Sequence, residues 1–149
     1  DFEADTGKQG WFIDLNYPDS RGERVVQPPQ LIDGRVEFTT LIPSDDPCAG
    51  GGVSGLVGLN AASGARPEDP IFDLNGDGEF DDSDMVMVNG ELVAPSMIDP
   101  GVGVAGAPSY VFNPVDGMVY RIISGTDGYE IIPAESSSAG TQRTWRQLR

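Results

Sequence analysis

Two β-strands joined by a tight turn are predicted by the stretch Leu31-Ile32-Asp33-Gly34-Arg35-Val36-Glu37-Phe38-Thr39-Thr40-Leu41-Ile42. Asp33-Gly34 is a hairpin signal, because a two-residue turn of this kind needs residues that tolerate positive φ angles. From Val36 to Thr40, apolar or small residues alternate with charged or polar ones, as in a strand with one buried face. The stretch therefore predicts an antiparallel hairpin and an all-β fold.

Short apolar runs separated by turn residues continue along the rest of the chain. Asn89-Gly90 separates two such runs, residues 85–88 and 91–94, and is a strong hairpin signal. Further strands are predicted at residues 10–15, 23–26, 54–60, 109–112, 117–123, 129–132 and 144–149. Because Gly, Pro or Asn interrupts every longer apolar pattern with helical spacing, helices should be scarce.

Composition narrows the classes of function. The 149 residues have the length of one domain, and the 20 Gly and 12 Pro favour many turns. A net charge of −15 repels nucleic acid and anionic membrane surfaces, and no apolar run is long enough for a membrane span. The sequence has no His, the commonest general base, and no carboxylate pair in a shared apolar setting outside one acidic loop. We therefore predict no nucleic-acid partner, no membrane span and no enzymatic activity.

The acidic loop spans residues 73–84 and matches the twelve-residue calcium loop position by position. Gly78 stands at position 6, where the backbone turns too sharply for a Cβ. Phe80, at position 8, is apolar and is predicted to anchor the loop to the core. The predicted metal ligands, at positions 1, 3, 5, 7, 9 and 12, are Asp73, Asn75, Asp77, the backbone carbonyl of Glu79, Asp81 and Asp84.

Calcium is the predicted ion because it is a hard cation that takes six to eight oxygen ligands with loose geometry, whereas magnesium demands a tight octahedron. Two carboxylates held about 4 Å apart repel by roughly 4 kcal/mol at an effective dielectric of about 20, so a cation favours their crowding. The alternative interpretation is an acidic, solvated turn. Asp84 at position 12, in place of Glu, is similar to dockerin-type loops, and the following hairpin signal favours a static site over a helical sensor.

Weaker signals leave alternatives open. The lone Cys48 cannot form a disulfide within the chain, and residues 48–52 form either an anion-binding nest or a flexible connection. Residues 134–142 are Ser-rich and predicted to be flexible. The chain opens at Asp1 without an initiator Met, so we expect a processed product or the C-terminal part of a larger protein.

A weak internal repeat between residues 28–38 and 107–120 suggests successive propeller blades, although a β-sandwich would give a similar pattern.

Several strings together resemble a known family, the type IV pilus tip adhesins of the PilC/PilY type. The family's C-terminal, β-propeller-like region contains GERV, FTTLIP, DPC-GGG and FDLNGDG-FD. In this chain the matching strings are Gly22-Glu23-Arg24-Val25-Val26, Phe38-Thr39-Thr40-Leu41-Ile42-Pro43, Asp46-Pro47-Cys48-Ala49-Gly50-Gly51-Gly52 and Phe72-Asp73-Leu74-Asn75-Gly76-Asp77-Gly78-Glu79-Phe80-Asp81. The resemblance runs from about residue 10 to residue 149 and is most specific in residues 22–84.

The resemblance implies that residues 1–149 are the terminal blades of a propeller-like domain, with the EF-hand-like calcium loop inserted between strands. It also implies a non-catalytic protein at the cell surface, on the pilus tip or outer membrane, that acts in pilus biogenesis, retraction control, adhesion and twitching motility. Minor pilins or pilus tip subunits, a host or surface receptor and the rest of the parent propeller are the implied partners. The alternative is a calcium-stabilised carbohydrate- or matrix-binding module of a secreted enzyme.

Overall fold

Antiparallel strands make up nearly all regular structure in the computed structural model, which describes residues 10–15, 22–46 and 51–134. The one helical element of these residues is the 3₁₀ turn η1 (Asp82–Asp84). In this described part, no helix is long and apolar enough to cross a membrane. The expectation of an all-β fold with scarce helices is confirmed.

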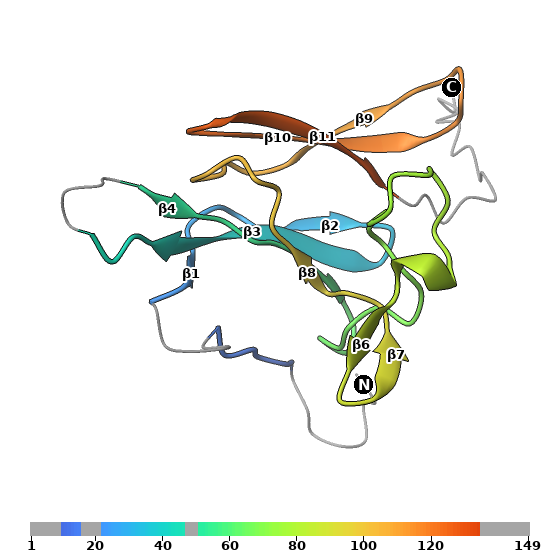
Figure 1. Ribbon diagram of the computed structural model, residues 1–149, viewed down its shortest axis with the longest axis horizontal. Helices are drawn as coiled ribbons and strands as arrows, with labels where there is room; N and C mark the ends of the chain where they lie inside the picture. The colour runs from blue at the N-terminus through green and yellow to red at the C-terminus, as the bar shows by residue number, and fades with distance from the viewer. Residues whose placement is uncertain (1–9, 16–21, 47–50, 135–149) are drawn as a thin grey trace, which may run out of the picture.

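The strands form two stacked sheets and a separate hairpin (Figure 1). The larger sheet has the order β1-β3-β5-β8, and β2 and β4 also pair with β3. Its strands are β1 (Arg24–Val25), β2 (Gln30–Ile32), β3 (Arg35–Pro43), β4 (Gly52–Val53), β5 (Leu56–Asn60) and β8 (Met97–Ile98). The second sheet has the order β11-β10-β9, and its strands are β9 (Ser109–Phe112), β10 (Val119–Gly125) and β11 (Gly128–Ala134). The hairpin consists of β6 (Val86–Val88) and β7 (Glu91–Val93).

Both predicted tight turns are confirmed. Asp33 and Gly34 have φ angles of 46° and 75°, and they join β2 to β3. Asn89 and Gly90 have φ angles of 53° and 88°, and they join β6 to β7. In each turn both central residues occupy the left-handed region, which is the reason that Asx-Gly pairs are selected there.

The prediction of a strand at residues 10–15 was wrong. This segment forms no strand ladder, and side chains attach it to the larger sheet. The Trp11 ring packs against a buried cluster of Phe38, Val57 and Leu59, and its Nε1 donates a hydrogen bond to the Ala61 carbonyl oxygen (3.0 Å). The predicted strand at 144–149 and the flexible segment at 134–142 lie outside the described residues, apart from Ala134 at the end of β11.

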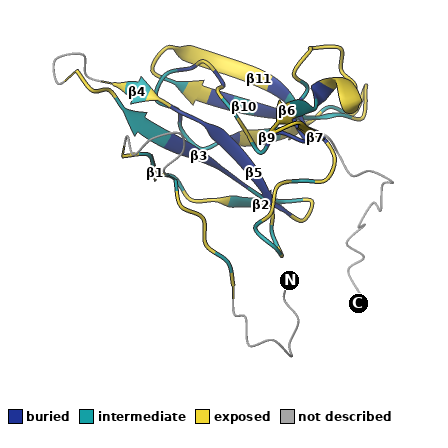
Figure 2. Ribbon diagram, turned by 60° about the horizontal axis from the view of Figure 1, so that its bottom comes forward, coloured by how far each residue is buried: buried dark blue, intermediate teal, exposed yellow. Residues whose placement is uncertain are grey.

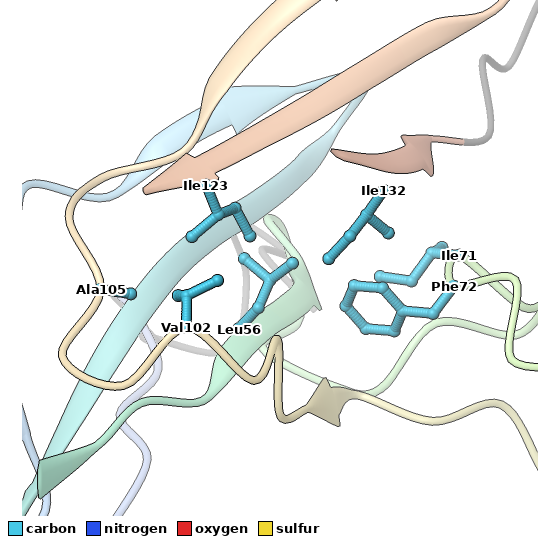
Figure 3. Packing of buried hydrophobic residues seen from close by; sticks show 7 residues of the cluster. All are labelled: Leu56, Ile71, Phe72, Val102, Ala105, Ile123 and Ile132. Atoms are coloured by element: carbon cyan, nitrogen blue, oxygen red, sulfur yellow. The ribbon is translucent and has the colours of Figure 1, made fainter. Parts of the chain in front are cut away.

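The main core lies between the two sheets (Figure 3). The side chains of Ile123 and Ile132 extend from the three-stranded sheet and pack against apolar side chains of β5 and of two connecting segments. The cluster consists of Leu56, Ile71, Phe72, Val102, Ala105, Ile123 and Ile132, each 8% exposed or less. This packing holds the two sheets face to face. No sheet closes on itself within the described residues, so the arrangement as propeller blades stays a prediction.

The three-stranded sheet also carries apolar side chains on its other face. Because Arg121, Ile123 and Ile132 point inward, the alternation along each strand and the register between strands place their neighbours outward. These outward residues are Val111, Tyr120, Ile122, Tyr129, Ile131 and Pro133, and Val111, Tyr129 and Ile131 are 48, 70 and 50% exposed. Figure 2 shows β11 exposed along much of its length. An antiparallel sheet with one face exposed to water usually carries polar side chains on that face, so this apolar outer face is unusual.

A fully buried ion pair joins the two sheets. Arg121 on β10 and Glu37 on β3 are both 0% exposed, and they form two parallel hydrogen bonds, from Nε to Oε2 (2.7 Å) and from Nη2 to Oε1 (2.8 Å). The Tyr110 hydroxyl donates a third hydrogen bond to Glu37 Oε2 (2.7 Å). Burial alone raises the pKa of Glu37, but the hydrogen bonds and charge of Arg121 and the Tyr110 hydroxyl outweigh it, and the pKa lies below its ordinary value.

The same arginine fixes the segment that leads into the acidic loop. Arg121 Nη1 donates to the carbonyl oxygens of Ile71 (3.1 Å) and Pro133 (2.7 Å). Its guanidinium carbon lies 5.1 Å from the centre of the Phe72 ring, a cation–π distance. Arg121 therefore contacts β3, β11 and the residues that precede Asp73.

Replacing Arg121 with Met should lower the free energy of unfolding by about 3–5 kcal/mol, because the buried Glu37 would lose both hydrogen bonds of Arg121 and keep only the longer contact with Arg35 Nε at 3.6 Å. The double variant Arg121→Met/Glu37→Met should recover a large part of this loss, since it removes both charges of the bidentate pair. Urea unfolding at neutral pH measures both, with Arg66→Met on the exposed surface as the control. A double variant no more stable than Arg121→Met would contradict this account.

Candidate functional site

The acidic loop, residues 73–84, leaves the core and returns to it, and its two ends lie close together. It begins directly after Phe72 (0% exposed) and ends at Asp84 (0% exposed). In Figure 1 it is the green to yellow-green excursion that ends at η1. Phe72 anchors the loop in the core, and the expectation that Phe80 does so was wrong, since Phe80 is half-buried and belongs to neither core cluster.

The Asp73 carboxylate organises the first half of the loop. Its Oδ1 accepts a hydrogen bond from the Gly76 amide (2.6 Å), and its Oδ2 accepts one from the Gly78 amide (2.9 Å). Gly76 and Gly78 have φ angles of 77° and 84°, a backbone conformation that disfavours a Cβ. The two glycines thus let the chain curl around the position 1 side chain.

The side chains at positions 3 and 5 follow the same pattern. Asn75 Oδ1 accepts from the Asp77 amide, and Asp77 Oδ1 accepts from the Glu79 amide, both at 2.8 Å. Asn75 Nδ2 donates to Asp77 Oδ2 (2.8 Å) and to the Ser83 hydroxyl (2.7 Å), which joins the two halves of the loop. Asn75 and Asp77 are therefore each held by the amide two residues later and by a hydrogen bond between their side chains.

Asp84 closes the loop from inside the protein. Its Oδ1 accepts hydrogen bonds from the amides of Leu74 (2.6 Å) and Asn75 (3.4 Å), and its Oδ2 accepts one from the Asp81 amide (3.3 Å). Asp81 in turn caps η1, with its Oδ1 accepting from the Ser83 amide (2.8 Å). Hydrogen bonding from the Ser83 hydroxyl and from the Ser83 amide holds the pKa of Asp81 below its ordinary value.

The six predicted ligands thus lie on one closed loop, but their exposure differs. Asp84 is buried and Asp73 half-buried, whereas Asn75, Asp77, Glu79 and Asp81 are exposed. Among the residues that the structure describes, no three Asp, Glu, His or Cys side chains form a group that could hold a metal ion by themselves. Backbone amides organise the carboxylates individually. Sequence reasoning missed Arg121, whose one signal was a lone charge within the apolar run of β10.

Comparison with known proteins gives matches of sequence and of fold, while no family model matches. The chain is 30% identical over 95 residues to the type IV pilus biogenesis factor PilY1 of Pseudomonas aeruginosa strain PAO1, which covers 63% of this chain and 8% of that protein. It is 29% identical over 127 residues to PilY1 of strain UCBPP-PA14, covering 76% of this chain and 11% of the relative. A PilY1 homolog of Xylella fastidiosa is 45% identical over 60 residues, 38% of this chain and 4% of that protein.

Among solved structures, the chain is similar to the crystal structure of the Pseudomonas aeruginosa PilY1 C-terminal domain, with a TM-score of 0.64 and 21% sequence identity over 80% of this chain and 21% of that one. The chain spans only 4–11% of the length of these curated relatives. In sequence and in fold the chain is similar to a class of proteins, the type IV pilus biogenesis factors. These matches support its membership in the PilY1 family, C-terminal region, and they confirm the resemblance seen in the sequence strings.

Replacing Asp84 with Ala should lower the free energy of unfolding by about 2–3 kcal/mol in the presence of a chelator, because three amides lose a charged acceptor inside the protein. Asp82→Ala, at an exposed carboxylate of the same loop, should change it by no more than about 0.5 kcal/mol. Urea unfolding of the three proteins measures the difference. Equal stability of the two variants would show that Asp84 does not close the loop.

Proposed function

We propose that this chain is a non-catalytic, calcium-binding part of a type IV pilus biogenesis factor that acts at the cell surface. The observation that carries the proposal is the loop at residues 73–84, whose oxygen-bearing side chains are already oriented by its own backbone amides. The family relationship supports the setting in pilus biogenesis.

The donor chemistry of the loop fits calcium. A carboxylate oxygen has two lone pairs. An oxygen that accepts one hydrogen bond from an amide therefore keeps its second lone pair for a cation. The proposed ligands are the side chains of Asp73, Asn75, Asp77, Asp81 and Asp84 and the backbone carbonyl of Glu79. This set includes an amide oxygen, a peptide oxygen and a carboxylate that can act through water. A calcium site with such mixed ligands does not require three carboxylates to meet at one point by themselves. When bound, the ion would neutralise part of the loop's negative charge.

The setting of the loop favours a static calcium site. Both ends are fixed, one by Phe72 in the core and the other by the buried Asp84. The chain continues into the hairpin β6–β7 and not into a helix that could swing outward. Calcium would therefore stabilise a single conformation of this part of the protein, in contrast to a sensor that opens on binding.

We also propose that the two sheets are the terminal blades of a propeller-like domain. The support is the apolar outer face of the three-stranded sheet, together with the match to 21% of the solved PilY1 C-terminal domain chain. The rest of the parent propeller would cover this face, since sheets pack face to face through such surfaces. Minor pilins or pilus tip subunits and a host or surface receptor would be the further partners. Roles in retraction control, adhesion and twitching motility would follow.

Calorimetric titration should show saturable calcium binding to the wild-type chain and its loss in Asp77→Ala. At a free calcium concentration 100 times the Kd, binding stabilises the fold by about 2.7 kcal/mol, which raises the melting temperature of the wild type only. Asp82→Asn, which removes a loop charge that is not a proposed ligand, should still bind. Absence of binding to the wild type, or unchanged binding to Asp77→Ala, would refute the calcium assignment.

In the intact parent protein, Asp77→Ala should reduce the number of surface pili and remove the calcium dependence of twitching, because the loop would lose its ion. Electron microscopy of surface pili and subsurface twitching assays at low and high calcium measure these effects. Strains with Asp82→Asn should behave like the wild type. Normal piliation and normal calcium-dependent twitching in the Asp77→Ala strain would show that pilus function does not depend on this loop.

A further inference from the structure

A half-open pocket of about 220 Å³ lies between residues 10–15 and the β5–β8 edge of the larger sheet. Its walls are mostly apolar, and two carboxylates and one hydroxyl also line it. The lining residues are Ile13, Asp14, Leu15, Glu23, Val57, Leu59, Ser96 and Met97. The pocket is separate from the acidic loop, since none of residues 73–84 lines it.

Glu23 lines this pocket, and one oxygen of its carboxylate lacks a hydrogen bond. Its Oε1 is buried from solvent and has no hydrogen-bond partner. Asp14 provides a second carboxylate in the same pocket, while no arginine of the described residues lines it. A buried carboxylate oxygen without a donor is unfavourable, so the pocket lacks a positively charged or hydrogen-bonding group.

We propose that this pocket receives a Lys or Arg side chain from an extended segment of a partner polypeptide. The apolar walls of Val57, Leu59 and Met97 would pack against the aliphatic stem, and Glu23 and Asp14 would bind the charged head. Such side chains combine an apolar body with a cationic end, which is the combination that the lining offers. The net charge of −15 would also steer a basic segment toward the protein.

Other occupants match the pocket less well. An apolar side chain would fill the walls but leave Glu23 Oε1 without a donor. A bare divalent cation needs six to eight oxygen ligands, whereas five of the eight lining residues are apolar. An acidic side chain would meet two carboxylates of its own sign. Charge complementarity thus selects a basic side chain.

The surroundings of the pocket leave room for a peptide backbone. A second hollow of about 520 Å³ shares Ser96 and Met97 with the pocket and continues toward the hairpin β6–β7. Strand β8, which contains Met97, is the outermost strand on this side of the larger sheet. Met97 itself is 43% exposed. An extended segment can therefore cross Met97 and place one side chain in the pocket.

The test uses the full 149-residue chain and two synthetic peptides, N-acetyl-Val-Lys-Val-amide and the same peptide with norleucine in place of Lys. Methyl NMR titration should show saturable shifts of Val57, Leu59 and Met97 with the lysine peptide, and binding at least tenfold weaker with the norleucine peptide. Glu23→Gln should weaken binding of the lysine peptide by at least fivefold. Glu91→Gln, which removes an exposed carboxylate outside the pocket, should bind like the wild type.

The peptide comparison needs no variant, so the proposal stays testable even if Glu23→Gln does not fold. Equal affinity for the lysine and norleucine peptides would overturn it, because the carboxylates would then contribute nothing. Absence of saturable shifts at the pocket methyls would overturn it as well. The result is independent of calcium binding, since the titration is run with a chelator present.

Discussion

The buried ion pair between Arg121 and Glu37 is the constraint on which the rest of the structure depends. Its partners are 84 positions apart in the chain and belong to different sheets. A buried pair adds little net stability compared with apolar residues of similar volume, but it leaves few alternative arrangements, because each charge must meet its partner. Here Arg121 also binds two backbone carbonyls, which fixes the stacking of the sheets and the segment that enters the acidic loop.

The order of the acidic loop follows from this constraint. Because Ile71 and Phe72 are fixed in the core, Asp73 starts from a defined point, and the loop's own amides arrange the oxygens that follow. Asp84 returns the chain to the interior. The loop therefore has a defined conformation that depends on hydrogen bonds between near neighbours. A proposed ion would add to that order and would not have to create it.

Local signals made much of this structure predictable. The turns at Asp33-Gly34 and Asn89-Gly90 depend on the φ preference of two adjacent residues, and sequence alone located both. The twelve-residue loop was recognisable because its spacing is local as well. The pairing of Arg121 with Glu37 was not, since it depends on how two distant strands face each other.

Two errors have the same physical origin. Residues 10–15 have the composition of a strand, but tertiary contacts of Trp11 decide their position, and no neighbouring strand pairs with them. The prediction of Phe80 as anchor assumed that the ring inside the loop faces the core. In the fold, the ring just before the loop does so, next to the Arg121 guanidinium.

The pairing of β5 with β8 has a consequence for how this domain can change over evolutionary time. These strands are neighbours in the larger sheet, so residues 61–96, with the acidic loop and the hairpin β6–β7, amount to one elaborated hairpin connection. The acidic loop is a closed excursion within it, because Asp84 Oδ1 lies 2.6 Å from the Leu74 amide nitrogen. Closing a longer or shorter loop at the same two points costs little extra entropy. Descendants of this domain can therefore lengthen, shorten or exchange residues 73–84 while Ile71 and Phe72 keep their places in the core and the strand register on either side persists.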